Sequence, residues 1–265
     1  MPRFVSRSRA SAFCRWISCG ITGTMAVDGV QSWPKLILFG DSITQFSFSS
    51  DGCWGSLLAD LVQRKCDVIN RGFSGYNVRW CRPMLPQLVT KDVAKDTAAI
   101  TIFLGANDSN DFEENPRQHV PLPEYKEGLT SMVEHLLSVG VSRDKIILIS
   151  PPAFDAVEWK KECIKKGRPL SKNNKTTGKY AAACKEVAGQ CGTQLVDLYS
   201  QMMSTADWEK CLNDGLHLSA DGSRLLFNQL QPLIEQLTSN IPMKFPLWDE
   251  VDAENPKPSL LPFKK

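Results

Sequence analysis

The sequence predicts an α/β fold in which a doubly wound, five-stranded parallel sheet lies between two layers of helices. Five short apolar runs recur along the chain, and each is followed by a longer segment that mixes polar and apolar residues. Near-continuous apolar character is typical of strands that are covered on both faces, as in a parallel sheet. Strands and helices that alternate in this way, with right-handed crossovers, build a three-layer α/β/α sandwich.

The expected strands are rich in Ile, Val, Leu and Phe. They are KLILFG (35–40), CDVIN (66–70), AAITIFLG (98–105), KIILIS (145–150) and TQLVDLY (193–199). Four intervening segments carry apolar residues at helical spacing, so each is expected to form an amphipathic helix. These segments cover residues 54–65, 125–140, 178–192 and 219–237.

The composition is that of an ordinary globular protein, with 42% hydrophobic and 23% charged residues in a chain of 265. No internal repeat or second domain is recognisable, so a single domain is expected over residues 31–241. Residues 242–265 contain five prolines and are expected to form a Pro-rich C-terminal tail.

The charge balance argues against a polyanionic partner. The net charge is only +2, whereas nucleic-acid binding normally leaves a basic face or stripe. No apolar run approaches the ~18 residues that a membrane span needs. Residues 1–24 contain four arginines and no acidic residue, which resembles a mitochondrial transit peptide. We favour the alternative, an N-terminal extension (residues 1–30) of a cytoplasmic protein, because Met25 offers a natural start shortly before the first strand.

The cysteines are nine in number and scattered, without a C-x-x-C pair, and the chain has only three histidines. This pattern does not fit a zinc site, and the cysteines are expected to be reduced thiols. Neither a metal nor an organic cofactor is therefore expected.

Ligands of open parallel sheets bind beyond the carboxyl ends of the strands, so the residues that follow each strand are the place to look for a site. Gly40, Asp41 and Ser42 follow the first expected strand. Gly75 follows the second and Asn107 the third. A strand followed by Gly-Asp-Ser is also ordinary turn chemistry, so the serine by itself is ambiguous.

Asp214 and His217 lie in the loop DGLH before the last expected helix. Their spacing lets a carboxylate and an imidazole project to the same side of a turn, where the acid can fix the tautomer of a histidine base. The Asn107 amide and the Gly75 backbone N–H are candidate donors to an oxyanion. Each of these residues also has a purely structural explanation in a turn. His119 and His135 lack such a partner and are expected to be solvated.

Four sequence blocks, FGDSI, NRGFSGYN, GAND and DGLH, occur in this order, each after an expected strand or in the last loop. Together they resemble the four-block pattern of the SGNH (GDSL-type) hydrolases. The longer phrases LFGDSITQFSF and LNDGLHLSADG resemble the isoamyl acetate-hydrolysing esterase branch of that family. The resemblance extends over residues 36–247 and implies a flavodoxin-like SGNH hydrolase fold.

The resemblance also implies a serine esterase that acts on short acyl esters, such as acetates of small alcohols, through an acyl-enzyme intermediate. It implies Ser42 as the nucleophile, with Asp214 and His217 completing the triad. The implied oxyanion donors are the backbone N–H groups of Ser42 and Gly75 and the side chain of Asn107.

Several alternatives stay open at this point. Phe46, Phe48 and Trp54 follow the serine and either line a small apolar substrate pocket or pack the first helix against the sheet, which we favour. The same triad would serve an acyltransferase, a thioesterase or a carbohydrate esterase. A non-catalytic flavodoxin-like binding module would use Ser42 only as a cap. The α/β-hydrolase elbow G-x-S-x-G and the dinucleotide fingerprint G-x-G-x-x-G are absent. The sequence carries no signal for the oligomeric state.

Overall fold

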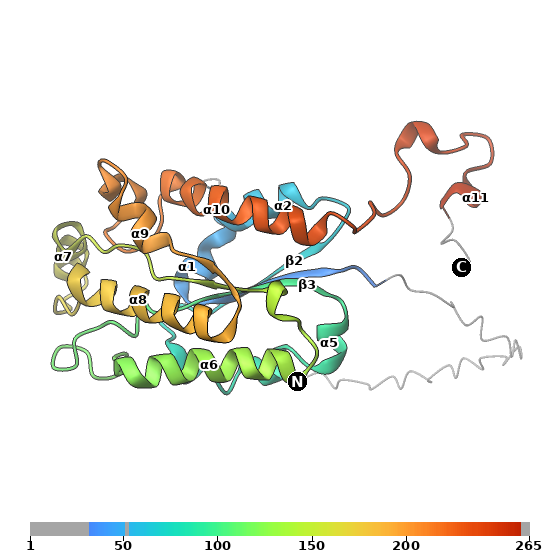
Figure 1. Cartoon of the computed structure of the whole chain (residues 1–265). Coiled ribbons are helices and arrows are strands. Elements are labelled where there is room, and N and C mark those ends of the chain that lie inside the picture. Colours follow the sequence, from blue (N-terminus) through green and yellow to red (C-terminus); the bar gives the residue numbers. More distant parts are fainter. Residues whose placement is uncertain (1–31, 51–52, 261–265) are drawn as a thin grey trace, which may run out of the picture. The chain divides into compact units, whose positions relative to one another are not determined.

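The computed structural model describes residues 32–50 and 53–260. Its centre is a sheet with the strand order β2-β1-β3-β4-β5, in which every neighbouring pair is parallel (Figure 1). The strands are β1 (Lys35–Gly40), β2 (Asp67–Gly72), β3 (Thr97–Phe103), β4 (Ile146–Ile149) and β5 (Gln194–Val196). The chain moves from β1 outward to β2 and then crosses to the other side of β1, which is the doubly wound topology. The predicted fold class is confirmed.

Four long helices cover the two faces of the sheet. On one face lie α2 (Trp54–Leu61) and α10 (Ala220–Thr238), and on the other lie α6 (Leu122–Ser138) and α8 (Asn174–Cys191) (Figure 1). Strand β1 faces both layers, because Leu36 and Leu38 are buried with the first pair and Ile37 and Phe39 with the second. Burial on both faces is the reason for the continuous apolar run in the sequence.

The remaining helical segments connect these elements or follow α10. They are α1 (Ser42–Gln45), η1 (Phe46–Phe48), α3 (Val78–Cys81), α4 (Leu85–Leu88), α5 (Lys91–Lys95), η2 (Arg143–Lys145), α7 (Ala156–Lys165), α9 (Leu198–Met203), η3 (Trp208–Cys211), η4 (Trp248–Glu250) and α11 (Pro256–Leu260).

Some expected boundaries differ from the observed ones, each for a local reason. The strand expected over 193–199 ends at Val196, because the Asp197 side chain accepts a hydrogen bond from Ser200 N and starts α9. The helix expected from residue 125 begins at Leu122, with a proline in its first turn. Helix α7 was not predicted, because its apolar residues Val157 and Ile164 are 74% and 71% exposed and give it no inward apolar stripe.

Of the two expected terminal segments, the structure describes most of the C-terminal tail. The prediction for residues 1–30 lies outside the described residues, so the choice between an extension and a transit peptide stays a prediction. In the expected tail, the Arg64 guanidinium donates to the carbonyls of Lys244, Phe245 and Pro246, and η4 and α11 follow. Within residues 32–50 and 53–260, no helix combines the length and the apolar character that a membrane span requires.

Candidate active site

Ser42 is the first residue of α1, and only Asp41 separates it from the end of β1. The Asp41 side chain caps this helix by accepting a hydrogen bond from Ile43 N at 2.9 Å. Gly40 is required for close packing, because a Cβ atom there would lie 2.4 Å from the carbonyl oxygen of Phe103 on β3. The turn therefore holds the serine at the carboxyl end of the sheet, where its side chain is almost fully buried at 5% exposure.

The loop that carries Asp214 and His217 is closed on itself and tied to α7. Asn213 N donates to the carbonyl of His217 at 2.8 Å, and Asp155 N donates to the carbonyl of Gly215 at 2.9 Å. Gly215 has φ +88°, a left-handed conformation that favours glycine. These bonds fix the direction in which the loop presents its acid and its imidazole.

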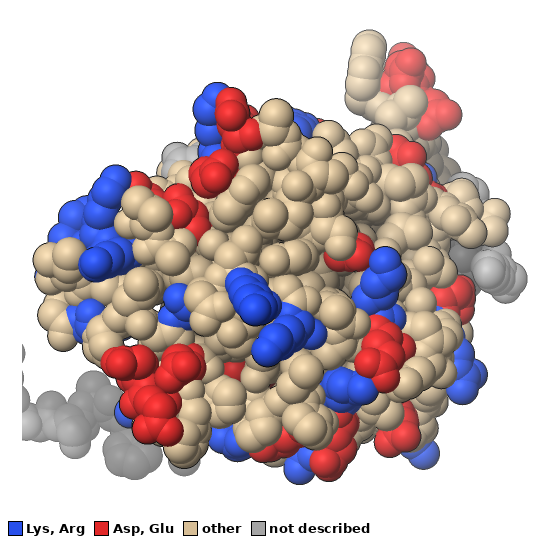
Figure 2. Space-filling view, turned by 60° about the vertical axis from the view of Figure 1, so that its left-hand side comes forward, with Lys and Arg blue, Asp and Glu red and all other residues tan. Residues whose placement is uncertain are grey.

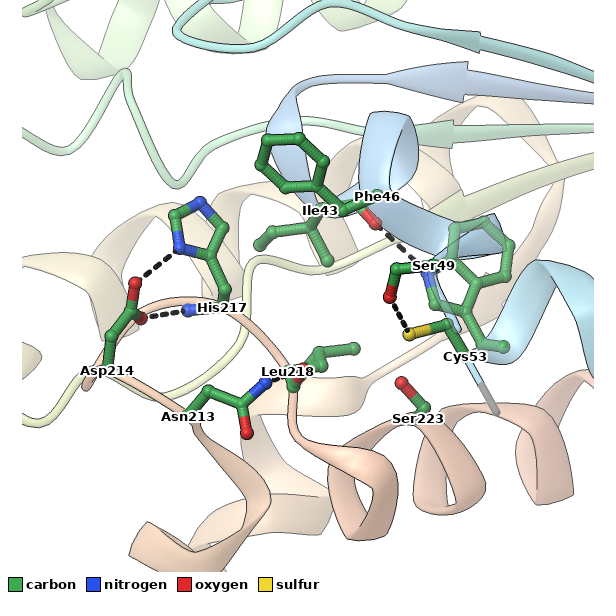
Figure 3. A pocket seen from close by; sticks show the side chains of 10 residues that line it. Ile43, Phe46, Ser49, Cys53, Asn213, Asp214, His217, Leu218 and Ser223 are labelled. Carbon is green, nitrogen blue, oxygen red and sulfur yellow. Dashed lines mark hydrogen bonds and ion pairs between the residues drawn. The ribbon is translucent and has the colours of Figure 1, made fainter. Parts of the chain in front are cut away.

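The Asp214 carboxylate accepts three hydrogen bonds from the same loop, and Figure 3 shows the two that come from His217. Its Oδ1 accepts from Leu216 N at 3.0 Å and from His217 N at 2.8 Å. Its Oδ2 accepts from His217 Nδ1 at 2.7 Å. Burial alone would raise the pKa of Asp214, but the bonds from the His217 ring and from the two backbone N–H groups lower it below its usual value.

The other ring nitrogen of His217 faces the serine. His217 Nε2 lies 2.9 Å from Ser42 Oγ, although the two residues are 175 positions apart. Because an ionised carboxylate can only accept, the hydrogen of the neutral ring sits on Nδ1 and Nε2 presents a lone pair to the Ser42 hydroxyl. This arrangement can take a proton from the serine and stabilise the resulting imidazolium.

Two aromatic rings hold the imidazole in place. The centroids of Phe46 and Trp159 lie 5.7 Å and 6.0 Å from that of His217, both in edge-to-face geometry. Trp159 belongs to α7, a helix that was not predicted, so no sequence pattern indicated that it reaches the site.

Gly75 and Asn107 reach the same place because the strands before them end level with β1. Gly40 pairs with Gly72 on β2 and with Phe103 on β3. Asn107 Nδ2 donates to the carbonyl of Tyr76 at 2.8 Å, which uses one of its two amide hydrogens.

A single glutamine ties the two candidate oxyanion donors together. Gln118 Nε2 donates to the carbonyl of Gly75 at 2.8 Å and lies 3.4 Å from Asn107 Oδ1. Gly75 itself has φ +81°, which favours glycine and leaves no side chain over the cavity. Sequence reasoning missed Gln118, since a lone glutamine in a loop carries no signal.

Two cavities meet at Phe46 and His217. The larger, of about 760 Å³, is lined by Ser42, Gly75 and Asn107 among others. The smaller has a volume of about 250 Å³, and Figure 3 shows the side chains that line it. Its lining includes Ile43, Phe46, Cys53, Trp54, Leu218 and Ser223.

The three aromatic residues proposed for a substrate pocket have different positions. Phe46 lines both cavities. Trp54 lines the smaller one and also packs on Phe103 of the sheet, with its Nε1–H donating to the carbonyl of Ile43 at 3.1 Å. Phe48 is 41% exposed and lines neither of these two cavities.

The expectation that His119 and His135 are solvated is wrong. Both rings are half-buried and hydrogen-bonded to backbone carbonyls. His119 Nδ1 lies 2.6 Å from Asn110 O, and His135 Nε2 lies 3.0 Å from Val89 O. A ring N–H that donates to a carbonyl explains each histidine without a catalytic role.

A buried charged cluster lies beneath the site. Lys172 donates to the carbonyl of Ala106, next to Asn107, and Asp108 Oδ1 accepts from Val78 N at 2.8 Å. Burial raises the pKa of Asp41 to about 6 and that of Asp108 to about 7, and it lowers the pKa of Lys172 to about 7. The described residues contain no group of three or more His, Cys, Asp or Glu side chains placed to hold a metal ion.

Comparisons with known proteins point to a single family. The model of the GDSL-like lipase/acylhydrolase family matches residues 38–225. The chain is 50% identical over 231 residues to the isoamyl acetate-hydrolyzing esterase 1 homolog of Mus musculus, covering 86% of this chain and 92% of that protein. It is 47% identical over 251 residues to the corresponding protein of Homo sapiens, covering 94% and 98% of the two chains.

Solved structures show the same architecture. A lipase/acylhydrolase from Enterococcus faecalis matches with a TM-score of 0.57 and 25% identity, over 80% of this chain and 98% of that one. An acetylxylan esterase from Geobacillus stearothermophilus, a catalytic mutant, matches with a TM-score of 0.58 over 77% and 95%, and at 22% identity it supports the fold alone. The resemblance found in the four sequence blocks is confirmed: this chain belongs to the GDSL-like lipase/acylhydrolase family and is an ester hydrolase.

Proposed function

We propose that this protein is a serine esterase that hydrolyses short-chain, acetate-type esters through an acyl-enzyme intermediate. In the first half-reaction, His217 Nε2 takes the proton of the Ser42 hydroxyl while Ser42 Oγ attacks the ester carbonyl carbon. The carbonyl oxygen becomes an oxyanion, which accepts hydrogen bonds from Ser42 N, Gly75 N and the Asn107 amide. The imidazolium of His217 then gives its proton to the leaving alcohol as the C–O bond breaks.

The second half-reaction repeats these steps with water. His217 takes a proton from a water molecule, whose oxygen attacks the acyl-enzyme carbonyl. Collapse of the second tetrahedral intermediate returns the proton to Ser42 and releases the carboxylic acid. Asp214 holds the Nδ1–H tautomer throughout, so that Nε2 is always the nitrogen that accepts the proton.

The observation that carries this proposal is the continuous relay from Asp214 Oδ2 through His217 to Ser42 Oγ, with contacts of 2.7 Å and 2.9 Å. A serine that only capped a helix would not need an imidazole aimed at its oxygen, nor a carboxylate behind that imidazole. The acetate-type substrate is supported by the names of the mouse and human relatives. The larger cavity is of the size that small-molecule sites normally have.

The test is hydrolysis of p-nitrophenyl esters with acyl chains from C2 to C12 by the full chain. We expect activity that is greatest at C2–C4 and is lost in Ser42→Ala. Ser138→Ala, at the exposed end of α6, is the matched control and should keep wild-type rates. No turnover of any ester by folded protein would contradict the proposal and favour the binding-module alternative. Transfer of the acyl group to an added alcohol, in place of water, would favour an acyltransferase.

A further inference from the structure

The larger cavity beside Ser42 has a strongly basic lining. Four of its lining residues, Arg117, Lys166, Arg168 and Lys172, are cationic, and only Glu114 is acidic. The whole chain has 31 basic and 29 acidic residues, so this imbalance is not a general property of the protein. The smaller cavity has Asp214 and no Lys or Arg in its lining.

The four cations are not equivalent. Lys172 is buried beside Asp41 and Asp108, and burial lowers its pKa to about 7, so it adds little positive charge to the cavity at neutral pH. Arg117 and Arg168 are exposed, and no ion pair joins either guanidinium to a carboxylate of the described residues.

Lys166 lies on the side of the cavity that is next to His217. Its Nζ lies 5.8 Å from the ring centroid of Trp159, and that ring packs against His217 at 6.0 Å. Lys166 also contacts Glu162 Oε2 at 3.5 Å. Figure 2 shows basic side chains gathered near the middle of one face of the molecule. Lys166 therefore places a positive charge on the side of the cavity next to the imidazole, which in the proposed reaction must face the oxygen of the leaving alcohol.

We propose that this cavity selects esters whose alcohol part carries an anionic group, such as a carboxylate, which Arg117 and Arg168 bind while Lys166 adds to the positive potential. The proposal rests on the esterase function proposed above and names its substrate class more closely. Guanidinium groups suit this role because they bind carboxylates through two parallel N–H···O bonds. The competing explanation is that these residues only form a solvated rim.

The two explanations predict different relative values of kcat/KM for a matched pair of acetate esters. 4-Acetoxybenzoate carries a carboxylate on its alcohol part, and 4-acetoxybenzamide has nearly the same shape without the charge. We measure kcat/KM for both esters with the full chain and correct for spontaneous hydrolysis. The acid-to-amide ratio is kcat/KM for 4-acetoxybenzoate divided by kcat/KM for 4-acetoxybenzamide. Each contact between an exposed arginine and the substrate carboxylate is weak. From the two contacts with Arg117 and Arg168 together we expect an acid-to-amide ratio of roughly 5–20.

Charge reversal then locates the effect. Arg117→Glu and Arg168→Glu should each lower the acid-to-amide ratio by about threefold or more. Lys160→Glu is the matched control, because Lys160 is exposed on α7, lies outside the cavity lining and changes the net charge by the same amount. It should change the ratio by less than a factor of about two, since an unfocused surface charge is screened.

A second measurement needs no variant. Raising the NaCl concentration from about 0.02 M to 0.5 M should bring the wild-type ratio toward one, because salt screens exposed charges. A ratio of one or below in the wild type, or a ratio that neither arginine variant changes, would overturn this inference. In that case, hydrolysis of the acetate ester of 4-acetoxybenzamide would still leave the esterase proposal intact. If folded protein hydrolyses neither acetate, the esterase proposal fails and this inference fails with it.

Discussion

Replacing Asp214 with asparagine should move the hydrogen of the neutral His217 ring from Nδ1 to Nε2. In the structure, Oδ1 of Asp214 accepts from two backbone N–H groups, at 3.0 Å and 2.8 Å. An asparagine must keep its carbonyl oxygen on those two donors, because its NH₂ group cannot accept from them. The NH₂ group then occupies the position of Oδ2 and faces Nδ1 of the imidazole. Since NH₂ donates, Nδ1 must give up its hydrogen, which moves to Nε2 and faces Ser42.

The size of the effect follows from the loss of the base. With Nε2 protonated, no lone pair meets the Ser42 hydroxyl, and the nucleophile has no acceptor for its proton. We expect kcat to fall by about 10⁴, the loss that the same Asp-to-Asn substitution causes in a serine protease triad. The two backbone hydrogen bonds to Oδ1 persist, so Asp214→Asn should fold normally.

The assay is p-nitrophenyl acetate hydrolysis by the full chain, with thermal unfolding to verify the fold. Asp221→Asn removes an equivalent charge seven residues away, in the first turn of α10, and should keep most of the activity. Wild-type rates in folded Asp214→Asn would refute the reasoning, because they would show that this carboxylate does not set the tautomer of His217.

Three further predictions concern neighbouring residues. Asn107→Ala should lower kcat by roughly 10²–10³ with a smaller change in KM, because an oxyanion donor acts on the transition state, and equal losses in binding and turnover would contradict this. Gly40→Ala should reduce the free energy of unfolding by about 1–3 kcal/mol, measured in urea, because its Cβ would meet the Phe103 carbonyl, and an unchanged midpoint would disprove that contact. Asp108 has its pKa raised to about 7 by burial, so between about pH 4 and pH 7 the folded chain keeps a proton that the unfolded chain releases. The stability of the wild type should therefore fall relative to Asp108→Asn as the pH rises from 5 to 7, and a constant difference in Tm would contradict the assignment.

Much of the fold and the core of the candidate site could be predicted from the sequence because both follow from the same strands. The apolar runs mark where the sheet is covered on both faces. The polar blocks after them meet at one edge, because β1, β2 and β3 end in register at Gly40, Gly72 and Phe103. The sequence pattern therefore predicts Ser42 and Asn107 side by side, and both line the larger cavity.

The parts of the site that were missed come from segments without a periodic pattern. Trp159 and Lys166 lie in or just after α7, where Val157 and Ile164 face solvent and Cys163 is the only buried residue. Lys172 is in a connecting segment, where a lysine is normally taken to be solvated, and only the folded chain shows that it is buried against Ala106. Hydrophobic periodicity has no means of finding such residues, since tertiary packing alone brings them to the serine.

The central claim, that Ser42 is the nucleophile, is tested most directly by covalent capture. The full chain and its Ser42→Ala variant are incubated with a fluorophosphonate, and intact mass and peptide mapping locate any adduct. We expect one adduct per chain on the peptide that contains Ser42, and none in the folded variant. An adduct on another residue, or none on folded wild-type protein, would contradict it.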